Sequence, residues 1–196
     1  MRRQLLLLAG IIMVMLVTSA RMGWAAEYDF RRTKWGMPQE DVLAAEPMKP
    51  VAKNERMLTY QTKILEKNVD LFFLFVQDKL LGATYQLNED YLRSSKYTQT
   101  FNTFKKALTK KYGPPAKEMT VWFNDLYRKK PAERGLALSL GHLEYYAVWE
   151  TAATNIKCSL RGENYDILCK IEYSSKEYIP LLKEAEESEK VVIDPL

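Results

Sequence analysis

Apolar residues recur at helical spacing between residues 97 and 112. Five of them are separated by four, three, four and four positions, which places them on one helix face: Tyr97, Phe101, Phe104, Leu108 and Tyr112. The opposite face carries mainly lysines: Lys105, Lys106, Lys110 and Lys111. Gly113 and Pro114-Pro115 end the pattern, because proline cannot continue a helix. The sequence predicts a helix laid on a sheet. Its lysine face is expected to be solvated, with an anion or a membrane head group as the alternative ligand.

The segments before this helix have the alternation of strands. Residues 58–66 alternate apolar and polar side chains, and residues 69–77 are apolar on both faces, as expected of a central strand. A third strand at 80–87 completes an antiparallel meander, with turns predicted at Lys67-Asn68 and at residues 77–79. A short helix is expected to begin at Pro38, and residues 47–56 are expected to form a loop.

The same plan partly repeats after Pro115. Strands are predicted at 119–124, 143–151, 156–160 and 165–173, with the last turn around residues 161–164. Residues 131–140 fit a helix or a strand, and Pro131 and Gly141 at their boundaries favour the helix, although Gly135 weakens both.

These patterns together predict the fold class and the domain organisation. We expect an α+β fold with one or two antiparallel sheets, built from two helix-plus-β-meander units whose helices pack on one face. It would form a single domain over residues 27–178, and a polar helix and tail would follow at 179–196.

The first 26 residues have the parts of a signal peptide. Arg2 and Arg3 precede an apolar run at residues 5–17, and Gly23-Trp24-Ala25 provides a cleavage site beside Ala26. The run is shorter than the roughly 20 residues of a spanning helix. We predict an exported protein, periplasmic or secreted, with no stable membrane span after cleavage. An uncleaved anchor is the alternative.

Cleavage would change the charge of the chain. The 196 residues include 29 Lys and Arg and 25 Asp and Glu. Arg2, Arg3 and Arg21 lie in the signal, which leaves 26 basic and 25 acidic residues. A nearly neutral chain has no overall attraction for nucleic acid, so no nucleic-acid partner is expected.

Cys158 and Cys169 are the only cysteines. If residues 160 and 167 face each other in the last hairpin, then Cys158 faces Cys169, and an oxidising compartment permits a disulfide. A register shifted by two residues would instead leave two buried thiols. We favour the disulfide, and the spacing contains no CxxC redox motif.

Reactive groups are sparse in this sequence. His142 is the only histidine, and the cysteines are not spaced as zinc ligands. Ser139 lies near His142 in sequence, although triads are defined by spatial geometry. Glu89-Asp90 and Glu163-Asp166 are expected to be solvated loop charges. No phosphate-binding glycine motif is present, so no catalytic residue, metal or cofactor is predicted.

Three motifs carry a resemblance to a family. They are Trp35-Gly36-Met37-Pro38, Lys111-Tyr112-Gly113-Pro114 and the WETAATNI run at residues 149–156. In this order they resemble a group of uncharacterised exported bacterial proteins over residues 28–178. The plan is also similar to the β-lactamase-inhibitor-like fold of small outer-membrane assembly lipoproteins. Pro38 replaces the usual Ser or Thr, and residues 124–142 are additional. The resemblance implies no catalytic residues.

Three functions from different classes follow from these features. The first is a non-catalytic envelope protein that binds a protein partner, of unknown oligomeric state. The second is a carrier of a small apolar or lipid ligand, with a pocket at Phe72, Phe73, Leu74 and Phe101, although these residues could equally fill the space. The third is a hydrolase that uses His142.

Overall fold

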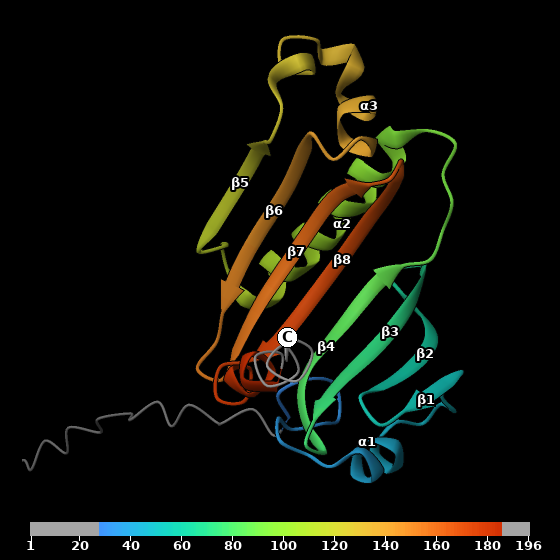
Figure 1. Ribbon diagram of the computed structural model, residues 1–196, viewed down its shortest axis with the longest axis vertical. Helices are drawn as coiled ribbons and strands as arrows, with labels where there is room; N and C mark the ends of the chain where they lie inside the picture. The colour runs from blue at the N-terminus through green and yellow to red at the C-terminus, as the bar shows by residue number, and fades with distance from the viewer. Residues whose placement is uncertain (1–27, 186–196) are drawn as a thin grey trace, which may run out of the picture.

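A computed structural model describes residues 28–185, which form an α+β fold around one open antiparallel sheet. The predicted signal cleavage site at Gly23, Ala25 and Ala26 lies outside the described residues. The eight strands follow the order β1-β2-β3-β4-β8-β7-β6-β5 across the sheet (Figure 1). Their bounds are Ala52–Asn54, Met57–Ile64, Lys67–Val76, Lys79–Leu87, Lys117–Trp122, Leu143–Glu150, Thr154–Glu163 and Asp166–Ser175 for β1 to β8.

Two meanders, β1–β4 and β5–β8, share this sheet. They meet where β4 pairs with β8, from Gly82 opposite Ser174 to Gln86 opposite Lys170. The predicted α+β class and the antiparallel meanders are therefore confirmed, and the two units form one continuous sheet. The strand β1, within the predicted loop 47–56, was missed because its three residues are all exposed and carry no hydrophobic pattern.

The helix α2, Ser94–Tyr112, packs across β6, β7 and β8 (Figure 1). Phe101, Phe104 and Leu108 are buried, as the spacing predicts, because residues three or four apart share a helix face. Lys106 and Lys110 on the other side are exposed. Gly113 ends the helix with a positive φ of 87°, and its amide donates to the Thr109 carbonyl at 2.9 Å. The predicted helix and its buried face are confirmed.

The first meander is covered by the segment that precedes it. Helix α1, Gln39–Ala45, buries Val42, and the loop before it buries Phe30. The Phe30 ring lies 5.7 Å from the ring of Phe73, 5.4 Å from Tyr85 and 4.8 Å from Tyr173. These three rings stand on β3, β4 and β8, so one side chain spans the junction between the two meanders.

Two buried tryptophans connect the three motifs of the family resemblance. The Trp35 Nε1 donates to Thr154 Oγ1 at 2.8 Å, and the Trp149 Nε1 donates to the Gly113 carbonyl at 3.0 Å. The first bond joins the N-terminal segment to β7, and the second joins β6 to the end of α2. The motifs therefore have a structural role at one end of the sheet.

Two-residue turns set the strand register and correct the predicted one. In the β2–β3, β3–β4 and β7–β8 turns both central residues have positive φ: Leu65-Glu66, Gln77-Asp78 and Asn164-Tyr165. Such pairs are typical of the primed hairpin turns that match strand twist. The first turn therefore precedes the predicted Lys67-Asn68, and the last lies at the end of the predicted 161–164 segment. The last hairpin pairs Cys158 with Ile171 and Leu160 with Cys169.

An insertion between β5 and β6 forms one end of the molecule. It contains the 3-10 turns η1 (Asp125–Tyr127) and η2 (Pro131–Glu133) and the helix α3 (Arg134–Ser139). The helix favoured for residues 131–140 is confirmed. Two close approaches require glycine: a Cβ at Gly135 would lie 1.9 Å from Ser94 Oγ, and one at Gly162 would lie 1.7 Å from the Leu138 carbonyl oxygen.

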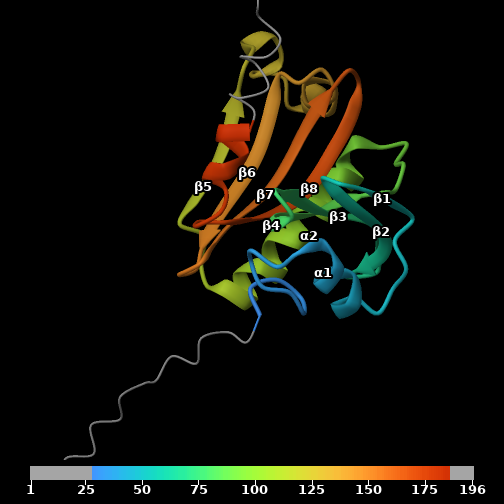
Figure 2. The same ribbon diagram turned by 60° about the horizontal axis from the view of Figure 1, so that its bottom comes forward.

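The C-terminal part of the described chain lies on the other face of the sheet. Residues 180–185 are helical, and they lie on the side opposite α2 (Figure 2). Ile179 and Leu182 face Leu74, Thr84 and Val148 there. The helix begins at Pro180 as predicted, although the face it covers differs from that of α1 and α2.

Truncation of Phe104 tests the packing of α2. The side chain is fully buried, so Phe104→Ala is expected to lower the free energy of unfolding by about 3–5 kcal/mol. Lys106→Ala on the exposed face of the same helix should change it by less than about 0.5 kcal/mol. Urea unfolding followed by circular dichroism measures both, and similar losses for the two variants would contradict this packing.

Candidate functional site

The two cysteines are buried free thiols, which corrects the predicted disulfide. The reason is the register of the β7–β8 hairpin: each cysteine faces an apolar residue, and the two sit diagonally, two residues apart along the strands. Diagonal neighbours lie too far apart for the Cβ spacing of a disulfide. Burial raises the pKa of Cys169 to about 12 and raises that of Cys158 well above its ordinary value. Both thiols are therefore poor nucleophiles.

His142 and Ser139 do not form a nucleophile–base pair. The Ser139 hydroxyl donates to the Leu136 carbonyl at 3.0 Å, closing a turn of α3. The His142 ring stacks on Tyr127 at 5.8 Å, and its amide donates to the Ala137 carbonyl at 2.9 Å. Within residues 28–185 no hydrogen bond joins Ser139 to His142, and the buried Nδ1 of His142 has no partner. Both side chains serve the local structure of the insertion.

The four residues expected to line a carrier pocket are split between the two faces of the sheet. Phe73 and Phe101 are buried in the core, Phe73 on β3 and Phe101 on the buried face of α2. Phe72 and Leu74 alternate with Phe73 on β3 and so point to the opposite face. Leu74 there lines a hollow of about 420 Å³, together with Val148, Ile179 and Leu182. Space for a ligand therefore lies under the C-terminal helix and not between sheet and α2.

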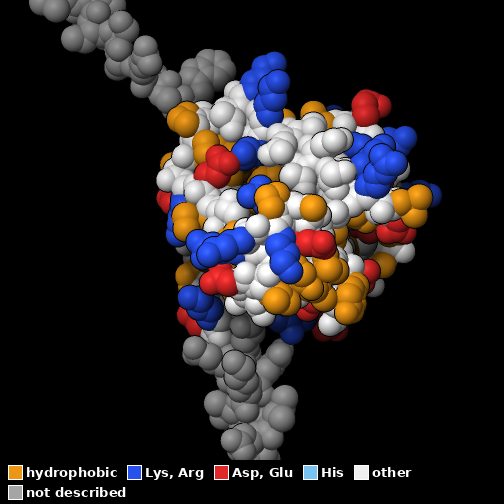
Figure 3. Space-filling model, turned by 90° about the horizontal axis from the view of Figure 1, so that it is seen from above, with side chains coloured by type: hydrophobic (Ala, Val, Ile, Leu, Met, Phe, Trp, Pro, Cys, Tyr) orange, Lys and Arg blue, Asp and Glu red, His pale blue; other side chains and the backbone are white. Residues whose placement is uncertain are grey.

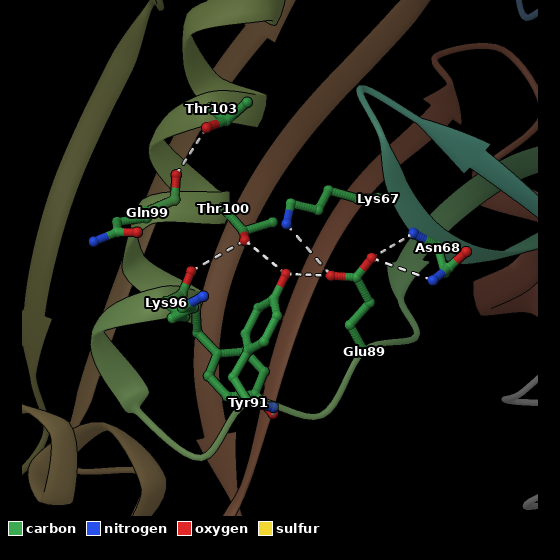
Figure 4. Close-up of polar contacts among 9 residues, drawn as sticks. Lys67, Asn68, Glu89, Tyr91, Lys96, Gln99, Thr100 and Thr103 are labelled. Atoms are coloured by element: carbon green, nitrogen blue, oxygen red, sulfur yellow. Dashed lines mark hydrogen bonds and ion pairs between the residues drawn. The ribbon is translucent and has the colours of Figure 1, made fainter.

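A polar cluster around Glu89 joins three parts of the fold (Figure 4). Glu89 Oε1 accepts from the Asn68 amide at 2.8 Å, and Oε2 lies 3.4 Å from Lys67 Nζ. The Tyr91 hydroxyl donates to Oε2 and lies 3.3 Å from Thr100 Oγ1 on α2. The first residues of β3, the connection 88–93 and the N-terminal half of α2 are thereby held together.

The charge state of Glu89 depends on these neighbours. The hydrogen bond from Tyr91, then that from Asn68 and the nearby Lys67, lower the Glu89 pKa below its ordinary value of 4.5. Sequence reasoning assigned Glu89 to the solvent, because its partners lie 21 and 22 residues before it in the chain. These groups come together only in the folded chain, where the cluster connects the first meander to α2. We call this cluster, Lys67, Asn68, Glu89, Tyr91 and Thr100, the latch.

A second buried polar group lies under the first meander. Arg31 Nε donates to Glu46 Oε1 at 2.8 Å, and Arg31 also donates to the Tyr85 hydroxyl at 3.2 Å. The Glu46 side chain is fully buried. Its Oε2 and the Tyr60 hydroxyl have no hydrogen-bond partner within residues 28–185. The ion pair ties the end of α1 to the N-terminal loop, and it brings no nucleophile or proton relay to the surface.

The face of the sheet opposite α2 carries a row of polar side chains on β6, β7 and β8. Lys157 Nζ lies 3.1 Å from Glu144 Oε1 and 5.1 Å from the centre of the Tyr146 ring. Ser159, Arg161, Lys170 and Glu172 continue this row beside a shallow cavity of about 180 Å³. We call the outward residues of β5–β8 the open face.

Further features limit the chemistry of residues 28–185. This part of the chain contains no group of three or more His, Cys, Asp or Glu side chains that could hold a metal ion. None of its helices combines the length and the apolar character needed to cross a bilayer. Comparison of the chain with protein-family models, with curated proteins and with solved structures finds no match. The function must therefore be argued from the surfaces described above.

Thiol labelling tests the state of the two cysteines. The native, unreduced protein is expected to resist a neutral-pH thiol reagent, because burial shields both groups and keeps them protonated. After unfolding without reductant, two thiols per chain should react. Unfolding with reductant provides the reference value of complete labelling. If the unreduced, unfolded chain had no titratable thiol, the two cysteines would form a disulfide after all.

Replacement of Glu89 tests the latch. At neutral pH, Glu89→Gln should lower the melting temperature by a few degrees, since a lost charge-assisted hydrogen bond costs about 1–3 kcal/mol. A group with a lowered pKa stabilises the fold above its unfolded pKa, and this stabilisation is lost as the pH falls through the folded pKa. The difference in melting temperature between the parent and Glu89→Gln should therefore shrink below pH 4.5.

The neighbouring exposed carboxylate provides the control for this series. Asp90→Asn makes the same chemical change one residue further along, at an exposed side chain. It should leave the free energy of unfolding at neutral pH within about 0.5 kcal/mol of that of the parent. Equal losses at both positions, or a Glu89→Gln difference that stays constant in acid, would rule out the latch.

Proposed function

We propose that this protein is a non-catalytic, exported envelope protein that binds a protein partner through its open face. The observation that carries the proposal is the composition of that face. It combines charged side chains with the half-buried aromatic ring of Tyr146 and the half-buried Val148 on a rigid antiparallel sheet. Mixed polar and apolar character of this kind is typical of non-obligate protein interfaces.

The arrangement of reactive groups also supports a binding role. The serine and histidine that suggested hydrolysis are held in separate local contacts, and the thiols are buried and protonated. The polar clusters at Glu89 and Glu46 connect structural elements. Export to the periplasm or beyond and the resemblance to exported bacterial proteins remain predictions from the sequence, and both are consistent with a role in the envelope.

A carrier function is the second candidate, and the hollow beside the C-terminal helix favours it. This hollow of about 420 Å³ has an apolar side formed by Leu74, Val148, Ile179 and Leu182. Its volume falls within the usual range of small-molecule sites. Protein purified from its host and examined by native mass spectrometry would carry additional mass if an apolar ligand occupied the hollow.

Photo-crosslinking in cells tests the protein-binding proposal. A photoreactive amino acid at Tyr146 or Lys170 on the open face should yield a defined adduct with another protein. The same probe at Lys106 on the outer face of α2 is the matched control and should yield monomer. Lys157→Glu reverses a charge within the face and should reduce the adduct by about tenfold, if one interfacial charge contributes about 1.4 kcal/mol.

Two results would refute this binding mode. One is recovery of monomer alone from the open-face positions across envelope stresses, with the protein expressed and folded. The other is the same adduct from Lys106, which would place the partner on the helical side of the sheet. If Lys157→Glu left the amount of adduct unchanged, the partner would contact a part of the open face away from the row that includes Glu144 and Arg161.

A further inference from the structure

The insertion at residues 123–142 lies at one end of the molecule (Figure 1). Nine large hydrophobic residues are exposed within residues 28–185, and three of them belong to the insertion: Phe123, Leu126 and Leu136. Exposed Tyr165 donates its amide to the Ser139 carbonyl, and exposed Leu92 lies two residues before Ser94, which packs on Gly135. Single exposed apolar residues are ordinary, whereas a cluster indicates a binding surface. We call this end of the molecule, residues 92–96, 123–142 and 164–165, the tip.

The exposed residues of the tip stand on a constrained backbone. The Phe123 amide donates to the His142 carbonyl at 2.8 Å, and the Asn124 side chain accepts from the Leu126 amide at 2.9 Å. The Tyr165 amide donates to the Ser139 carbonyl at 3.1 Å. The close approaches at Gly135 and Gly162 seat α3 against α2 and β7. Phe123 and Leu126, 65% and 59% exposed, are therefore displayed by the fold.

Basic residues follow these apolar residues directly. Arg128-Lys129-Lys130 is a continuous basic run, and Arg134 starts α3. The segment 124–134 contains four basic and two acidic residues, whereas the chain without its signal is nearly balanced. Seen from above, this end of the molecule presents hydrophobic side chains among lysines and arginines (Figure 3). The excess of positive charge is thus local to the tip.

We propose that the tip docks on the surface of an anionic lipid bilayer. Phe123 and Leu126 enter the boundary between head groups and acyl chains, and the Arg128-Lys129-Lys130 run contacts lipid phosphates. The chemistry fits because bilayer binding combines buried apolar area with attraction of basic residues to anionic lipid. A protein partner fits less well, because a projecting end would need a matching concavity on that partner.

This contact is separate from the open face. The tip consists of turns and the short helix α3 at the end of β5 and β6, whereas the open face is formed by the outward side chains of the strands. An exported protein could therefore hold a partner on its sheet while the tip rests on lipid. The lipid proposal does not depend on the identity of that partner, and it is tested with purified components.

Vesicle co-sedimentation of the full chain without its signal tests the proposal. The protein should sediment with vesicles of phosphatidylcholine mixed with phosphatidylglycerol, and salt should weaken this binding. Phosphatidylcholine vesicles alone should bind it poorly. The double variant Phe123→Ser with Leu126→Ser should lose about tenfold in affinity, and Lys129→Glu with Lys130→Glu should lose at least as much.

Matched controls separate the tip from general charge and hydrophobicity. Lys106→Glu with Lys110→Glu makes the same charge change on the exposed face of α2, and Val51→Ser removes an exposed apolar residue beside β1. Both should bind anionic vesicles with the affinity of the parent. All variants should have the melting temperature of the parent. The proposal is overturned if the folded parent ignores anionic vesicles, if the α2 variant loses as much affinity, or if tip-directed crosslinkers capture a protein while vesicles bind nothing.

Discussion

The packing of Phe30 across the junction of β4 and β8 is the contact on which the rest of the fold depends. Each meander alone would leave an edge strand, β4 or β8, unpaired at the junction. Phe30 contacts rings on both sides of the junction, and the Trp35 indole reaches Thr154 on β7. Because a buried indole N–H needs an acceptor, the latter contact also fixes the orientation of the N-terminal segment.

Most of the elements could be predicted because their signals are local. The stripe on α2, the alternation in β2 and the apolar run of β3 depend on residues only a few positions apart, and the structure confirms the helix and both strands. Register is different, since a shift of two residues preserves which face each side chain occupies. Asn164-Tyr165 and Leu65-Glu66 form turns with positive φ without glycine, so composition gave no signal, and the predicted disulfide was wrong for that reason.

The polar and contact residues depend on long-range geometry that the sequence does not reveal. Glu89 was expected to be a solvated loop charge, yet it accepts a hydrogen bond from Asn68 at the start of β3. Gly135 weakened the prediction of a helix at 131–140, yet the glycine is required because Ser94 of α2 lies where a Cβ would stand. In both cases the residue is explained by a neighbour from another element. A lone glycine or carboxylate carries no information about that neighbour.

The use of aromatic and apolar residues divides the molecule into a closed interior and two outer surfaces. Phe73, Phe101 and Trp149 are buried in the core. The open face instead pairs its charges with one another, as Lys157 does with Glu144. At the tip, Phe123 remains exposed on a hydrogen-bonded backbone, although burying it would stabilise the fold. A ring that is held exposed in this way is more readily explained by a contact with another molecule than by a contribution to folding.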